Sequence, residues 1–204
     1  MTWSSAKDKD QFQTIFMTLL NKVSNSLAIY LGQQLPTLFE DWWYEAVLNI
    51  LSFQQRRRVK ERGINSLTAL DLAALLRVLD QNWYRISIKL KLTSESRHFV
   101  KEMQTIRNRW AHAGTDGFPV DDVYRDLDTL QRFAAVIDAD KKFINEVQAA
   151  KASLLSDRNP EPDKDGDLEQ QPNKRIKDNS AELKPGQIVF LKSDPSIKGA
   201  VVAV

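Results

Sequence analysis

Hydrophobic residues recur every three or four positions through the first 155 residues, which is the spacing of one buried helix face. The clearest stripe is formed by Phe12, Phe16, Leu19, Val23, Leu27 and Tyr30. Later stripes run through positions 70–86, 99–113, 123–137 and 143–154, and no segment before position 155 has the pattern of a strand. We therefore predict an all-α bundle of four to six helices over residues 1–155.

Residues with strong capping preferences predict where the first helices begin and end. Thr37 and Glu40 have the spacing of a capping box and would begin a helix that carries Trp42 and later apolar residues. The basic segment 56–62 is followed by Gly63, which we predict to be a C-terminal cap.

The middle of the chain predicts one long central helix and then a shorter amphipathic one. Asn65 or Ser66 would cap a helix that reaches Ile86, with leucines on more than one face. Such a helix is either central in the bundle or shares its second face with another subunit. Thr93 or Ser94 would begin the following helix, which we expect to end at positions 113–114.

The composition changes sharply after the helical region. Residues 156–183 are almost without large apolar side chains, so we predict a disordered linker. Its basic stretch 174–177 is either part of a solvated tether, or a nuclear-localisation or RNA-contact patch. Residues 184–204 contain two β-prone runs separated by turns and predict the start of a small β-barrel-like module. This module would continue in a longer protein, or its hairpin would pack on the helical domain.

Composition and charge exclude several classes of function. The chain of 204 residues has no cysteine, so thiolate metal sites and disulfides are excluded and a cytoplasmic location is expected. There is no apolar run long enough for a membrane span and no cofactor-binding motif, so we predict neither a membrane nor a cofactor as partner. We interpret the acidic residues 121–128 as a helix start rather than as a metal site.

The net charge is only +2, so nucleic-acid binding would depend on local clusters. The one dense basic cluster is either a solvated face or a strip that follows RNA phosphates. Within this cluster, the residues that we predict to bind RNA are Arg56, Arg57, Arg58 and Lys60.

The helix predicted from Ser94 onward carries the most promising arrangement for chemistry. Its apolar stripe is formed by Phe99, Met103, Ile106, Trp110 and Ala113. At about 100° per residue, Asn108 and His112 point away from this stripe, and Arg107 and Arg109 flank it. Histidine titrates near neutral pH and suits acid–base catalysis, and arginine binds phosphate. His98, the other histidine, is read as a surface residue.

The six residues 107–112, RNRWAH, resemble the motif of the HEPN superfamily, in which an arginine, a polar residue, three further residues and a histidine follow one another. Together with residues 70–83, LDLAALLRVLDQNW, they resemble one HEPN subgroup over roughly residues 10–150. Members of this subgroup occur in a eukaryotic RNA endonuclease of transcript quality control and at the N-terminus of bacterial phage-defence helicases.

This resemblance implies a metal-independent endoribonuclease that acts as a homodimer and leaves a 2′,3′-cyclic phosphate. It implies that Arg107 and His112 are the catalytic pair and that Asn108 supports them. We also predict that Arg109 contacts RNA. Two alternatives stay open. The domain could be a non-catalytic dimerisation or nucleic-acid-binding module of a helicase-like defence protein, or it could be a toxin neutralised by a partner protein.

Overall fold

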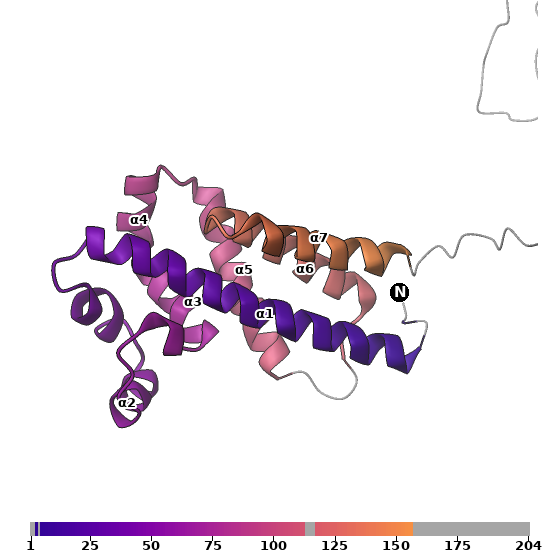
Figure 1. The fold of residues 1–204 in the computed structure, drawn as a ribbon, viewed down its shortest axis with the longest axis horizontal. Coiled ribbons are helices and arrows are strands. Elements are labelled where there is room, and N and C mark those ends of the chain that lie inside the picture. The colour runs from indigo at the N-terminus through magenta and orange to yellow at the C-terminus, as the bar shows by residue number, and fades with distance from the viewer. Residues whose placement is uncertain (1–2, 4, 113–116, 157–204) are drawn as a thin grey trace, which may run out of the picture. The chain divides into compact units, whose positions relative to one another are not determined.

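The computed structural model describes residues 3, 5–112 and 117–156 (Figure 1). Within these residues the chain forms seven α-helices and three short helical turns, and no strand. The all-α prediction is therefore confirmed. Most of the predicted linker and all of the predicted β module lie outside the described residues.

The longest helix, α1 (Ala6–Gln34), crosses the helical domain and forms much of its core (Figure 1). Ser5 caps it by accepting a hydrogen bond from the backbone N–H of Asp8 at 3.1 Å. The predicted stripe is buried, and Val23 and Leu27 are fully enclosed. Helices α3, α6 and α7 pack against this face.

Two short turns follow α1, and here the predicted capping box at Thr37 and Glu40 is wrong. The turn η1 (Leu35–Thr37) continues the helical path, so Thr37 lacks the extended backbone that a helix N-cap needs. Its hydroxyl donates to the carbonyl of Gln34 at 2.6 Å instead. The next turn, η2 (Trp43–Leu48), is π-helical and begins near Asp41, whose carboxylate accepts from the N–H of Tyr44 at 3.3 Å.

Helix α2 (Phe53–Glu61) is fixed at both ends by its own capping residues. At its start, Ser52 and Gln55 form a reciprocal capping box, with bonds of 3.3 and 3.0 Å. At its end Gly63 has a φ of 59°, and the N–H of Ile64 donates to the carbonyl of Val59 at 3.0 Å. The predicted glycine cap is confirmed.

The predicted single helix from position 65 or 66 to Ile86 is wrong in both its start and its continuity. Ser66 precedes only the short turn η3 (Leu67–Ala69), and α3 (Leu72–Gln81) begins after Asp71, whose carboxylate accepts from the N–H of Ala74 at 2.8 Å. A separate helix, α4 (Trp83–Leu90), follows the break at Asn82.

The break has a tertiary cause. The buried amide of Asn82 donates to the carbonyl of Ala46 at 2.9 Å and to that of Val78 at 2.8 Å, which ties the end of α3 to η2. Of the two predicted alternatives, the central position is confirmed for α3, which buries residues on several faces and packs against α1 and α5.

Three helices complete the bundle: α5 (Ser94–Ala111), α6 (Val120–Val136) and α7 (Lys141–Ser156). Thr93 caps α5, as one of the two predicted alternatives stated. The helix ends with His112 as its C-cap, before the expected end at positions 113–114, which lie outside the described residues. Helix α6 packs between α5 and α7, and the two predicted apolar stripes of α6 and α7 are buried.

Candidate nucleic-acid interface

A polar cleft of about 430 Å³ lies between the beginning of α2, helix α3 and helix α5. Helix α5 contributes Arg107 and Asn108 to it, together with Lys101 and Gln104. The other polar side chains that line the cleft are those of Ser52, Gln55, Arg77, Asp80 and Gln81. The predicted pair Arg107 and Asn108 therefore shares a concave surface with residues from two other helices.

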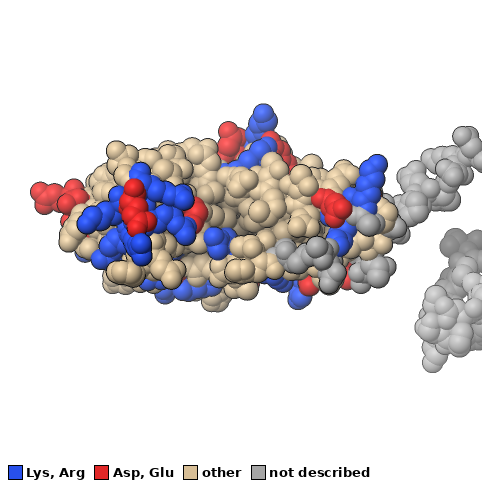
Figure 2. Space-filling model, turned by 90° about the horizontal axis from the view of Figure 1, so that it is seen from below, with Lys and Arg blue, Asp and Glu red and all other residues tan. Residues whose placement is uncertain are grey.

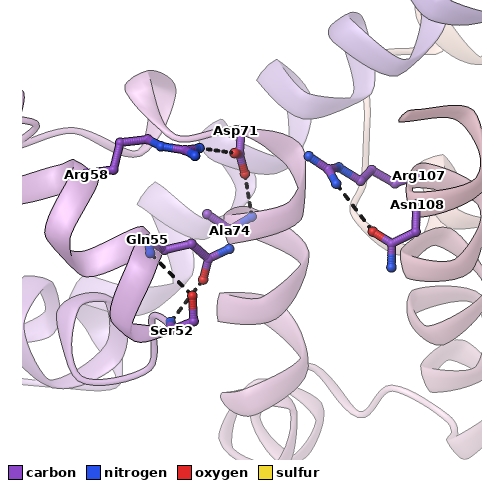
Figure 3. Close-up of polar contacts among 7 residues, drawn as sticks. All are labelled: Ser52, Gln55, Arg58, Asp71, Ala74, Arg107 and Asn108. Atoms are coloured by element: carbon purple, nitrogen blue, oxygen red, sulfur yellow. Dashed lines mark hydrogen bonds and ion pairs between the residues drawn. The ribbon is translucent and has the colours of Figure 1, made fainter. Parts of the chain in front are cut away.

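Arg107 has donors available for a phosphate. Its side chain extends from α5 toward α3 and the beginning of α2, as Figure 3 shows. Its Nη1 donates to the Oδ1 of Asn108 at 3.3 Å, and the guanidinium forms no other hydrogen bond or ion pair with the described residues. Because guanidinium has five N–H donors in a planar fork, most of them stay free to bind an anion.

His112 lies one turn beyond Asn108, at the end of α5. Both side chains are exposed, as the helical phase predicts. The backbone N–H of His112 donates to the carbonyl of Arg109 at 3.2 Å, and its imidazole has no partner among the described residues. His112 does not line the cleft that contains Arg107.

A buried carboxylate neutralises part of the positive charge around the cleft. Asp80 accepts from the Nζ of Lys101 at 2.5 Å, and its second oxygen lies 3.5 Å from the Nε of Arg97. This interaction fastens α3 to α5. Arg77 of α3 also lines the cleft, and its Nε donates to the carbonyl of Ile50 at 2.7 Å. Arg107 is the lining arginine without a carboxylate or backbone carbonyl partner among the described residues.

Arg109, predicted to contact RNA, points to the opposite side of α5 and pairs with the buried Asp126 of α6. The same carboxylate accepts from the indole N–H of Trp110 at 2.6 Å. Burial raises the pKa of Asp126, although these two hydrogen bonds act in the opposite direction. The role of Arg109 in RNA binding stays a prediction, and it would require that this ion pair opens or is shared.

Asp126 is a structural residue that the sequence interpretation missed. Asp121 and Asp122 do lie in the first turn of α6, as an acidic helix start should. Asp126 lies three positions after Val123 and four before Leu130, so its helical phase places it on the buried face. That phase was the available signal for an internal role.

The ring of Trp110 anchors the end of α5 in the core. It stacks on Phe16 with a centroid distance of 4.0 Å and lies 4.8 Å from Phe118. The indole N–H of Trp3 donates to the carbonyl of Phe118 at 2.7 Å. The interpretation of Trp110 as a core residue is therefore confirmed.

A comparison with protein-family models matches residues 18–138 to the family described as Swt1-like HEPN. The match covers more than half of the chain and includes both α3 and residues 107–112. The chain belongs to the Swt1-like HEPN family. A HEPN domain indicates an RNA-nuclease-type or nucleic-acid-binding module. Searches of curated proteins and of solved structures found no match.

The basic cluster of this HEPN domain lies on the outside of α2, where Figure 2 shows Lys and Arg side chains gathered around an acidic one. Arg57 pairs with Glu61 at 2.6 Å, and Arg58 lies 3.4 Å from Asp71. Arg56 donates to the carbonyls of residues 49 and 51, both at 3.3 Å. The side-chain ammonium of Lys60 has no partner among the described residues.

Two further findings concern other classes of site. Among residues 3, 5–112 and 117–156, no group of three or more histidine or acidic side chains is placed to hold a metal ion. None of the described helices is long and apolar enough to cross a membrane.

Proposed function

We propose that this HEPN domain is a metal-independent endoribonuclease that acts as a homodimer. The observation that carries the proposal is the end of α5, where Arg107 enters a polar cleft with only Asn108 as its partner among the described residues. The membership of the family supports the assignment of RNA as the substrate.

The reaction needs a base, an acid and a stabilising positive charge. His112 takes the proton from a ribose 2′-hydroxyl, and the oxygen attacks the adjacent phosphorus. The bond from phosphorus to the 5′-oxygen breaks, and a protonated histidine gives its proton to that oxygen. The products are a 2′,3′-cyclic phosphate and a 5′-hydroxyl end. Arg107 stabilises the charge on the phosphoryl oxygens, and Asn108 orients Arg107.

Two copies of the chain would supply the two histidines that this reaction uses. One imidazole cannot accept and donate a proton in the same step. In a dimer with twofold symmetry, each surface meets its own copy, so His112 of one protomer can act as base and that of the other as acid. The exposure of His112 at the end of α5 fits such an arrangement.

The test uses the 204-residue protein and a labelled single-stranded RNA in excess EDTA. We expect cleavage by the wild type, and a loss of roughly 10²–10⁴-fold in rate in R107A and in H112A. R125A is the matched control, because Arg125 is an exposed arginine on α6, outside this cleft. Absence of cleavage by a folded, dimeric wild type refutes the nuclease.

One observation favours a second function, a non-catalytic module for dimerisation and nucleic-acid binding. His112 does not line the cleft and no described side chain orients its imidazole, whereas a catalytic histidine is usually held by a partner. In this case, H112A should bind RNA as the wild type does, and neither protein should cleave it.

We also infer a role in anti-phage defence, as part of a larger helicase-like protein. The support is the similarity of residues 70–83 and 107–112 to that subgroup. Cells that carry the complete gene should restrict phage growth, and the R107A gene should not. Equal plaque counts with both genes would exclude a defence role that depends on Arg107.

A further inference from the structure

Phe53 is an aromatic residue that the core does not use. It is 80% exposed, the largest value among the big hydrophobic side chains that the structure describes. Its ring makes no stacking or cation–π contact with any described residue. Single exposed apolar residues are common, so the surroundings of the ring must decide whether it binds something.

The surroundings of Phe53 on α2 are cationic. Residues 56, 57 and 60 follow it at steps of three, four and seven, so they share its face of α2. The farthest of them, Lys60, lies two turns away, or about 10.5 Å along the helix axis. The capping box and the Gly63 cap define both ends of this helix, so the ring and the cations are presented on one helical face.

Most of these cations can engage a ligand at low cost. Lys60 has no partner among the described residues, and the pair of Arg57 with Glu61 is exposed on both sides. Exposed pairs of this kind contribute little stability, so a phosphate can replace the carboxylate. The basic face therefore offers phosphate contacts beside an open aromatic ring.

This face meets the cleft that contains Arg107 at the beginning of α2. Ser52 directly precedes Phe53 and lines the cleft, and so does Gln55. A strand bound along the outside of α2 would need only to cross the beginning of that helix to reach Arg107. The two surfaces can thus contact one RNA strand.

We propose that Phe53 stacks on an unpaired base and makes the outer face of α2 a binding surface for single-stranded RNA. This proposal rests on the proposed function for the identity of the ligand as RNA. A strand without a partner exposes its bases to aromatic side chains, whereas a duplex buries them in its own stack. The surface therefore selects single strands.

The test measures binding of a fluorescent single-stranded 12-nucleotide RNA and of a blunt duplex by anisotropy, with R107A in the background to prevent cleavage. We expect F53A to weaken binding of the single strand by roughly 5- to 150-fold, from the usual contribution of one stacked base. F53W should restore it. Binding of the duplex should not change, and neither should the salt dependence, because phenylalanine carries no charge.

The control is Y84A, since Tyr84 on α4 is also an exposed aromatic side chain, 76% accessible. It should bind RNA as the background protein does. Equal affinity of F53A and its background overturns the proposal, and so does a change in sedimentation that identifies Phe53 as a protein contact. If neither the wild type nor the R107A background binds RNA, the proposed function fails as well, which distinguishes the two failures.

Discussion

The buried carboxylate of Asp126 gives the sharpest test of how the end of α5 is held. It accepts hydrogen bonds from the guanidinium of Arg109 and from the indole of Trp110, and both donors belong to the six-residue motif. D126N keeps the shape of the side chain but replaces one acceptor oxygen with an N–H₂ donor. In either orientation, that donor faces Arg109 or Trp110.

The expected cost follows from these two contacts. Hydrogen bonds to charged groups contribute about 1.5–3 kcal/mol, and an unpaired buried donor costs about 1–3 kcal/mol. Burial raises the pKa of Asp126, so removal of the charge returns part of the desolvation cost. We therefore expect D126N to lower the free energy of unfolding by about 2 kcal/mol at neutral pH.

Urea denaturation followed by far-UV circular dichroism measures this difference. The matched control is D128N on the same helix, because Asp128 is partly exposed and pairs with Lys151 and Arg132. Pairs of this kind contribute about 0–1 kcal/mol. If D126N costs no more than D128N, the carboxylate does not hold the motif, and our reading of the α5 end is wrong.

Two further predictions concern pH and one backbone position. Because burial raises the pKa of Asp126, the folded state binds a proton at this carboxylate more readily than the unfolded state does. The free energy of unfolding of the wild type, relative to that of D126N, should therefore rise as the pH falls from neutral toward about 4. The pKa of Asp128 is lowered, mainly by its hydrogen bond with Lys151, so the contribution of Asp128 to the free energy of unfolding should be lost below about pH 4. If D126N and D128N show the same pH trend relative to the wild type, both assignments are contradicted. G63A should cost about 1 kcal/mol in the same assay, because φ at Gly63 is 59° and no neighbour lies near the added methyl group; an unchanged midpoint would exclude backbone strain there.

The sequence predicts those parts of the fold that depend on contacts within one helix. The stripes of α1, α6 and α7 recur at helical spacing, and the caps at Thr93 and Gly63 act on their own helix. The break at Asn82 depends on the carbonyl of Ala46, 36 positions earlier, and no local pattern indicates it. Propensity alone favours a continuous helix there, and a tertiary hydrogen bond overrides it.

The same division applies to the candidate site. The outward direction of Asn108 and His112 follows from the phase of one helix and could be predicted. The walls of the cleft could not, because Ser52 and Arg77 come from elements that meet α5 only in the folded domain. Asp126 was missed because its acidic neighbours at the start of α6 suggested a purely local role.

The attachment of α2 has a consequence for how a ligand enters the cleft. Of the residues in α2, only Val59 is buried. The segment that leads into α2 is held by the buried Leu51 and by the hydrogen bond from Arg77 to the carbonyl of Ile50, so α2 itself depends on few buried contacts of its own. Few buried apolar contacts and exposed backbone hydrogen bonds are features of regions that open locally at a low free energy. We expect the amides of α2 to exchange with deuterium before those of α3 and α5, so that one wall of the cleft moves while the wall that carries Arg107 stays in place.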